Sequence, residues 1–243
     1  MKHFKNFKTC VYCTAQTLAS LDETTLARDY AYLEKYVGID KVYLETYRDG
    51  TWVAIDHMKM IQNFFKEHGV EIAGGITAVT PPLEKDDAKR QRLFQTFCYS
   101  NETMRTYLKK IVTYTAELFD EIILDDFFFT SCTCDDCLRE RSNLSWAEFR
   151  SNKMIDVAEN LVLKPAKLAN PSVKVTIKYP NWRESYHETG YVPKIQPSMF
   201  DKIYTGTETR NTAHTDQHLP RYLSYSIMRY MEHVAPGRNG GGW

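Results

Sequence analysis

The chain has 243 residues, enough for one large domain or two small ones, and its hydrophobic fraction of 43% is that of an ordinary globular protein. Lysine plus arginine and aspartate plus glutamate both number 31, so no net charge favours binding to nucleic acid or to an anionic membrane. No segment is apolar enough for a membrane span, and the six cysteines do not resemble a disulfide framework.

Strands and helices alternate along the chain. The apolar and β-branched runs predict six strands, at residues 9–15, 41–47, 70–77, 121–129, 173–179 and 202–207. Capping residues and helical spacing predict helices that begin at Asp22, near Met58, at Thr103, at the capping box of Ser145 with Glu148, and at Leu219. A long loop over 78–99 and an irregular stretch over 186–199 connect some of these elements.

This alternation contains no hairpin signal, so it favours parallel strands joined by crossover helices. A doubly wound dinucleotide-binding fold would need G-x-G-x-x-G after the first strand, and that motif is absent. Polar and aromatic residues instead follow nearly every strand, as in a (β/α)₈ barrel. We therefore expect residues 1–243 to form one α/β, TIM-barrel-like domain with about six βα units, an incomplete barrel. Either the chain is the larger part of a longer barrel, or the sheet stays open and something, such as a homo-oligomer, covers its edges.

The segment 121–137, EIILDDFFFTSCTCDDC, holds the strongest functional signal. Its apolar triplet IIL predicts a strand buried on both faces, which Asp125 and Asp126 then interrupt. Burying a carboxylate is costly unless it is paired or lies at an opening, so two of them at a strand end indicate a site. The simpler interpretation is that the strand leaves the core here and an aspartate caps the next turn.

The same segment contains a candidate metal site. Cys132, Cys134 and Cys137 have C-x-C-x-x-C spacing, which lets three thiolates converge on one ion, and a structural zinc site needs a fourth ligand. Cys98 can supply it, because consecutive loops of a parallel barrel are neighbours at the carboxyl-terminal rim. The two cysteines of the first strand are three residues apart and point to opposite faces, so we expect them to be packing residues.

The stretch FCYSNETMR after the third strand, followed by CTCDDC after the fourth, resembles the zinc-binding pattern of the glycoside hydrolase family 42 β-galactosidases and related barrels. The resemblance covers mainly residues 95–150. It implies a (β/α)₈ barrel in which Zn²⁺ binds Cys98, Cys132, Cys134 and Cys137. Four cysteine ligands leave the ion no open position for water, so the metal is expected to be structural.

The fourth strand departs from that family. Family members end this strand in Asn-Glu, with the glutamate as general acid/base, and they carry the nucleophile on a seventh strand that we do not recognise here. The pair Asp125-Asp126 resembles instead the α-galactosidase and α-fucosidase type of barrel, in which an aspartate at this place is the nucleophile. The resemblance therefore implies glycosidase chemistry but not β-galactosidase activity.

Glycoside hydrolysis needs two carboxylates that flank the scissile bond. Strand alternation lets only one of Asp125 and Asp126 point into the barrel. We assign Asp126 as nucleophile or stabiliser, or Asp125 if the register is shifted by one. Glu208, at the end of the sixth strand, is the predicted acid. The alternative for Glu208 is an exposed loop glutamate paired with Arg210.

Four further residues are candidate substrate contacts. Glu45 is a third carboxylate, and Lys178 ends a strand where it would hold a carboxylate or a sugar hydroxyl. Tyr47 and Trp182 offer flat rings that can stack on sugars.

We therefore predict a glycoside hydrolase acting on a carbohydrate, with no nucleic-acid or membrane partner. A non-catalytic or degenerate carbohydrate-binding barrel is the alternative. The basic amino-terminal segment lacks the long apolar run of a signal peptide. We accordingly expect a cytoplasmic protein, or a periplasmic or secreted one whose signal peptide has been removed.

Overall fold

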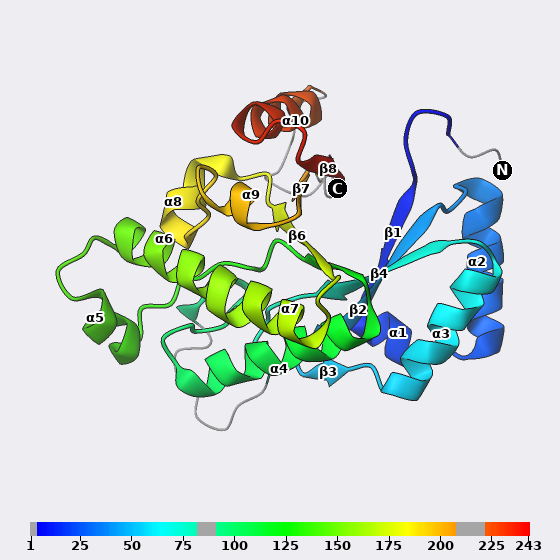
Figure 1. Ribbon diagram of the computed structural model, residues 1–243, viewed down its shortest axis with the longest axis horizontal. Coiled ribbons are helices and arrows are strands. Elements are labelled where there is room, and N and C mark those ends of the chain that lie inside the picture. Colours follow the sequence, from blue (N-terminus) through cyan, green and yellow to red (C-terminus); the bar gives the residue numbers. More distant parts are fainter. Residues whose placement is uncertain (1–3, 82–90, 208–221) are drawn as a thin grey trace.

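The structure is a computed structural model that describes residues 4–81, 91–207 and 222–243 (Figure 1). In these residues seven strands run parallel and follow one another through one sheet in chain order. They are β1 (Cys10–Cys13), β2 (Lys41–Arg48), β4 (Glu71–Ile76), β5 (Glu121–Leu124), β6 (Lys174–Tyr179), β7 (Lys202–Thr205) and β8 (Asn239–Gly242). All six predicted strands are present, and β8 is an additional one that the sequence did not indicate.

One hairpin interrupts the parallel order, so the expectation of no hairpins was wrong. The short strand β3 (Thr51–Trp52) pairs antiparallel with the end of β2. The turn between them is formed by Asp49 and Gly50, whose φ angles are 45° and 81°. Two successive residues with positive φ are what a tight two-residue hairpin requires, and Asp-Gly is a common sequence for it.

Helices connect the strands, and the predicted caps are confirmed. The side chain of Asp22 caps α2 (Glu23–Tyr36), and Ser145 with Glu148 forms the capping box of α6 (Trp146–Val157). The helix predicted from Ser145 continues through a π-helical turn, η3 (Ala158–Leu163), into α7 (Lys164–Ala169). The other long helices are α3 (Ile55–Glu67), α4 (Glu102–Leu118) and α10 (Leu223–Val234). The short ones are α1 (Ala15–Ser20), η2 (Leu93–Gln95), α5 (Asp135–Arg141), η4 (Arg183–Ser185), α8 (Tyr186–Thr189) and α9 (Gln196–Met199).

The sheet is curled around a small inner core. Tyr43 on β2 donates a hydrogen bond to the hydroxyl of Tyr204 on β7 over 3.0 Å, although three strands separate β2 from β7 in the sheet. These two rings pack with Ala73 and Ile123 on the concave face, whereas the larger core lies between the convex face and the helices. The expected incomplete TIM-like barrel is thus confirmed. Within the described ranges, no helix has the length and apolarity needed to cross a membrane.

Candidate active site and metal centre

Asp125 lies at the end of β5, with its side chain on the concave face of the sheet. On β5 the side chains of Glu121 and Ile123 point inward, where Glu121 Oε1 lies 3.3 Å from the Tyr43 hydroxyl oxygen. Asp125 comes two residues after Ile123, just beyond the last paired residue of the strand, and it lines the cavity on that face. The alternative register of the sequence prediction, with Asp125 inward, is therefore the one that the strand adopts.

Asp125 is buried but surrounded by hydrogen-bond donors. Lys178 Nζ lies 3.1 Å from its Oδ1, and Arg48 Nη2 lies 3.2 Å from its Oδ2. The backbone N–H of Asp126 donates to Oδ1 over 2.9 Å. Burial raises the pKa of Asp125, but the positive charges of Lys178 and Arg48 outweigh that effect and hold it below the ordinary value. Asp125 is therefore ionised at neutral pH.

Lys178 connects the two aspartates. Its Nζ lies 3.3 Å from Asp126 Oδ2 as well as 3.1 Å from Asp125 Oδ1, and only 3% of its side chain is exposed. The ammonium group also lies 4.7 Å from the centroid of the Trp243 ring, just after β8. The sequence prediction that Lys178 holds a carboxylate agrees with these contacts.

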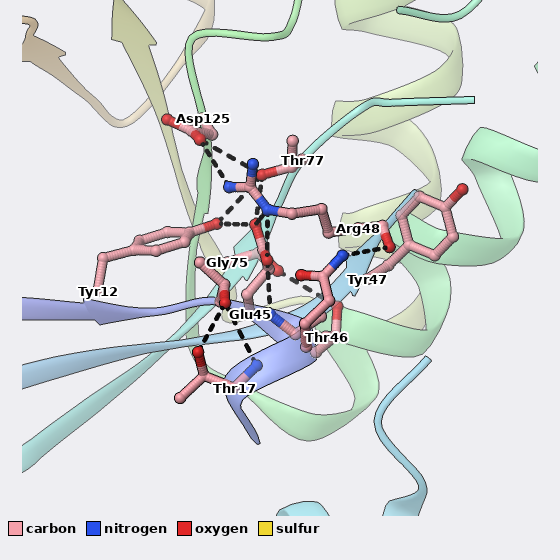
Figure 2. Close-up of polar contacts among 12 residues, drawn as sticks. Tyr12, Thr17, Glu45, Thr46, Tyr47, Arg48, Gly75, Thr77 and Asp125 are labelled. Carbon is pink, nitrogen blue, oxygen red and sulfur yellow. Dashed lines mark hydrogen bonds and ion pairs between the residues drawn. The ribbon is translucent and has the colours of Figure 1, made fainter. Parts of the chain in front are cut away.

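Glu45 is the centre of a second set of contacts on β2 (Figure 2). Its Oε1 accepts from the Tyr12 hydroxyl over 2.6 Å and from the Thr77 hydroxyl, and its Oε2 accepts from the backbone N–H of Ala15 over 2.7 Å. Arg48 Nε lies 2.9 Å from Oε2, while the far end of the same guanidinium contacts Asp125. The fully buried Glu45 therefore fixes the arginine that faces Asp125.

A glycine makes room for part of this network. A Cβ atom on Gly75 would lie only 2.7 Å from the hydroxyl oxygen of Tyr12, so the tyrosine ring crosses β4 where there is no side chain. The pKa of Tyr12 is raised well above its ordinary value by burial and by the charge of Glu45. Its hydroxyl thus stays protonated and serves as a donor to Glu45.

The cavity on the concave face has a volume of about 1130 Å³ and opens to solvent beside the exposed residues Asn6, Phe7 and Lys8. It extends from Lys41 and Glu121, at the amino-terminal ends of their strands, to Arg48, Asp125 and Trp243 at the carboxyl-terminal ends. This volume is slightly above the range of roughly 300–1,000 Å³ that is typical of small-molecule sites. A carboxylate kept ionised at the wall of such a cavity can stabilise positive charge on a bound ligand.

Two predicted substrate contacts lie elsewhere. Tyr47 is fully buried toward the helices, and its hydroxyl donates to the carbonyl of Val79 over 2.9 Å. The cause is a β-bulge between Glu45 and Tyr47, which breaks the alternation that would have placed both on one face. Trp182 packs against Phe129 at a centroid distance of 5.5 Å and lines a separate groove.

The structure thus brings Asp125, Asp126 and Lys178 into contact, and Arg48 links Glu45 to Asp125. Tyr47 and Trp182 do not belong to this group. A sugar contact for those two aromatic residues stays a prediction. Glu208 lies outside the described residues.

Sequence reasoning missed four residues of the site: Tyr12, Arg48, Thr77 and Trp243. The sequence did indicate which way Tyr12 points, because alternation along β1 places its side chain on the same face of the sheet as that of Cys10. Arg48 appeared to belong to the turn, and only the bulge in β2 turns it inward. Trp243 gave no signal because it follows a strand of Asn-Gly-Gly-Gly that has no apolar pattern.

The four predicted metal ligands converge. The sulfur atoms of Cys98, Cys132, Cys134 and Cys137 all lie within 4.8 Å of one another. Cys98 Sγ lies 3.6 Å from the sulfur atoms of both Cys134 and Cys137, and the latter two are 3.8 Å apart. Four thiolates placed about 2.3 Å from a central ion at tetrahedral angles would be roughly 3.8 Å apart, so the donor set fits a tetrahedral metal.

The cysteine cluster joins the loop after β4 to the loop after β5, the strand that ends just before Asp125. Cys98 comes from the loop after β4, and the other three come from the loop after β5 and the first turn of α5. Hydrogen bonds from Cys137 and Cys98 lower the pKa of Cys132. By contrast, Cys10 belongs to the inner core and Cys13 to the outer one, which confirms that they point to opposite faces and pack.

Comparisons with known proteins agree with a glycosidase-like fold. A family model described as "Probable glycosyl hydrolase, catalytic domain" matches residues 1–243. An uncharacterized protein of Saccharolobus solfataricus is 32% identical over 263 residues, covering 98% of this chain. The chain spans only 42% of that relative's length.

Solved structures show the same architecture at low identity. A thermostable mutant of a xylanase from Cellvibrio japonicus superimposes with a TM-score of 0.51 and 12% identity, over 97% of this chain and 68% of the xylanase chain. A β-glucuronidase from Bacteroides uniformis covers 91% of this chain with 22% of its own, at a TM-score of 0.48 and 12% identity. The xylanase match shows the fold, and the glucuronidase match lies too low to carry an argument.

Proposed function

Since the chain belongs to the family of probable glycosyl hydrolase catalytic domains, we propose that it cleaves a glycosidic bond in a carbohydrate, with Asp125 as nucleophile or electrostatic stabiliser. The observation that carries this proposal is the placement of Asp125 at the wall of the cavity with Lys178 at 3.1 Å and Arg48 at 3.2 Å, two cations that favour its ionised form. Glycoside cleavage passes through an oxocarbenium-like transition state, and a fixed carboxylate stabilises the positive charge that develops there.

The cations around Asp125 suit this role. Lys178 and Arg48 keep the carboxylate deprotonated and fix its two oxygen atoms, so its geometry is set before the sugar arrives. As the sugar becomes positively charged, Asp125 either donates an electron pair to the anomeric carbon or stabilises the charge. In the first case a covalent glycosyl intermediate forms, and water then hydrolyses it.

A second carboxyl group has to protonate the leaving oxygen. We propose Glu208 for this step, because it follows β7 and the carboxyl-terminal ends of parallel strands lie at one face. Of the described carboxylates, Asp126 is the one that shares Lys178 with Asp125. If Asp126 instead of Asp125 attacks the sugar, Glu208 is still the proposed acid and Lys178 still contacts the attacking carboxylate.

We further propose that the cysteine cluster holds one Zn²⁺, as the resemblance to the family 42 β-galactosidases implies. Four thiolate ligands occupy all tetrahedral positions, so such an ion would supply cross-linking and no activated water. Cys98, Cys132, Cys134 and Cys137 would then hold the loop after β5 that begins at Asp125 and Asp126. The ion would thereby stabilise the position of the catalytic strand end.

A carbohydrate-binding barrel without turnover is the second candidate. What favours it is that both oxygens of Asp125 already contact cations, which lowers the nucleophilicity of the carboxylate. Screening aryl glycosides of both anomeric types and several sugars tests the proposal directly. Release of the aryl group supports hydrolysis, whereas binding of the same compounds without release supports the second candidate.

A further inference from the structure

A second groove lies on the carboxyl-terminal side of the sheet, apart from the Asp125 cavity. Its volume is about 480 Å³, within the roughly 300–1,000 Å³ typical of small-molecule pockets. Residues from four segments line it, among them Phe94, Trp146, Arg150, Trp182 and Glu188. α6 runs beside α8 (Figure 1), and residues of both helices line the groove together with Ser131 of the loop that carries the cysteines.

Two aromatic rings of the groove, those of Trp182 and Trp146, are held in place by neighbouring side chains. Trp182 contacts the ring of Phe129 at 5.5 Å and that of Tyr191 at 5.7 Å. Trp146 lies 4.9 Å from the guanidinium carbon of Arg141 and equally far from that of Arg150. Rings that are fixed in this way lose little conformational entropy when a ligand stacks on them.

Phe94 is presented to solvent by an unusual backbone. Its side chain is 60% exposed, and φ is 51° at Phe94 and 55° at Gln95. Two successive non-glycine residues in the left-handed region are energetically unfavourable, and such strain is concentrated at functional sites. The turn is held by a hydrogen bond of 2.8 Å from the backbone N–H of Leu93 to the hydroxyl of Ser131. The chain thus maintains a strained turn that exposes an aromatic ring.

The groove is connected with the Asp125 site through aromatic rings. The guanidinium of Arg48, which contacts Asp125, lies 5.6 Å from the centroid of the Phe127 ring. Phe127 in turn contacts Phe94 at 5.4 Å, and Phe94 lines the groove with Trp182. Phe127 and Phe94 thus lie between Arg48 and the groove, so one ring contact links the groove to a residue that touches Asp125.

The polar groups of the groove fit an uncharged ligand. Arg150 donates from one terminal nitrogen to the carbonyl of Glu188 over 2.7 Å and from the other to the carbonyl of Ser131 over 3.1 Å. Arg150 and Glu188 are the charged residues that line the groove, and their opposite charges leave it with no formal net charge. The flat apolar faces of Trp182 and Phe94, with hydroxyl and carboxylate groups at the edge, match a pyranose ring with its apolar face and hydroxyl rim.

We propose that this groove binds an additional sugar unit of the substrate, so that the substrate class is a neutral oligosaccharide or polysaccharide. The inference rests on the proposed function, because the sugar in the groove belongs to the chain whose bond is cleaved at Asp125. Affinity should therefore increase with the length of the oligosaccharide until the groove is filled.

Isothermal titration calorimetry with cello-, xylo- and galacto-oligosaccharides, from the monosaccharide to the pentasaccharide, tests this inference. For one of these series we expect a gain in affinity with length of about tenfold, the size of one stacking contact. Trp182→Ala and Phe94→Gly should both abolish the gain. Phe94→Gly removes the ring and also relieves the positive φ, so it should not lower the melting temperature.

Tyr225→Ala is the matched control, because Tyr225 is an aromatic residue on α10 that is 69% exposed and does not line the groove. It should retain the gain with length. An affinity that does not depend on length in any series, or a gain that both groove variants retain, overturns the inference. Length-dependent binding without any bond cleavage would refute the proposed hydrolysis but leave the groove assignment standing. Cleavage of aryl glycosides without any dependence of oligosaccharide affinity on length would support the proposed hydrolysis but refute the groove assignment.

Discussion

Lys178 Nζ lies 3.1 Å from Asp125 Oδ1, with 3% and 8% of their side chains exposed, one residue beyond the paired positions Leu124 and Ile177 of β5 and β6. A buried ion pair of this kind contributes modestly to stability as a whole, but removing one partner leaves the other charge uncompensated. The pair therefore links the candidate chemistry to the stability of the sheet, and the two effects have to be measured separately.

Asp125→Asn should reduce turnover of a confirmed glycoside substrate by several orders of magnitude, because the charge that stabilises the transition state is lost. It should also lower the free energy of unfolding by about 3 kcal/mol, the low end for a broken buried pair, since Lys178 keeps its contact with Asp126. Steady-state kinetics and urea denaturation measure the two effects.

Glu140→Gln is the matched control for that variant. Glu140 on α5 pairs with Lys153 of α6, whose side chain is 8% exposed, and neither residue lines the Asp125 cavity. Glu140→Gln should lose stability without a comparable loss of turnover. Equal losses of turnover in both variants would mean that Asp125 acts through folding alone.

The pH dependence of stability follows from the lowered pKa of Asp125. Because its folded-state pKa lies below the unfolded value of about 3.9, its contribution is present above that pH and is lost as the pH falls through the folded-state value. The difference in unfolding free energy between the wild type and Asp125→Asn should stay constant from neutral pH down to about 4 and shrink below it. Denaturation curves across this range measure it, and a difference that disappears already near neutral pH contradicts the ionised state assigned to Asp125.

Metal content tests the cysteine cluster. Purified protein should contain about one zinc per chain, and Cys134→Ser should lose most of it, because a serine hydroxyl is a poor zinc ligand. Cys10→Ala, which removes a thiol outside the cluster, should retain the metal. Elemental analysis with a thiol titration decides the matter, since four unprotected thiols in metal-free, folded protein would exclude the site.

Glu208→Gln should reveal whether this residue is the acid. Loss of the proton donor should slow hydrolysis of substrates with poor leaving groups far more than that of dinitrophenyl glycosides, whose leaving group needs no proton. Glu117→Gln, an exposed carboxylate on α4, provides the comparison. Equal rates on both substrate types in Glu208→Gln and the wild type would remove Glu208 from the mechanism.

The sequence predicted the fold where local patterns and tertiary packing agree. Apolar runs located six strands, and Asp22 and Ser145 marked helix starts that the structure confirms. Cys132, Cys134 and Cys137 were found because their fixed spacing in a polar context carries information that ordinary core residues do not, and Cys98 was added because consecutive loops of a parallel barrel are neighbours. β8 was missed because its Asn-Gly-Gly-Gly sequence has no apolar pattern.

The site was predicted less completely, because alternation alone does not tell inside from outside. The choice between Asp125 and Asp126 depended on which face of β5 is concave, and that follows from contacts across the sheet, such as the one between Tyr43 and Tyr204, which a sequence does not show. Tyr47 was expected to contact the sugar, but a bulge in β2 turned it outward and Arg48 inward. Bulges of this kind leave no clear mark in a single sequence.

Trp243 is one of four tryptophans in the chain, and its ring lies 4.7 Å from Lys178 Nζ and 5.0 Å from the ring of Tyr12. The electrostatic contact of an ammonium group with an indole ring depends on how strongly the two are hydrated. A ligand that displaces water from this cavity should therefore change the fluorescence of Trp243. Comparison with Trp243→Phe would separate that signal from those of the other three tryptophans.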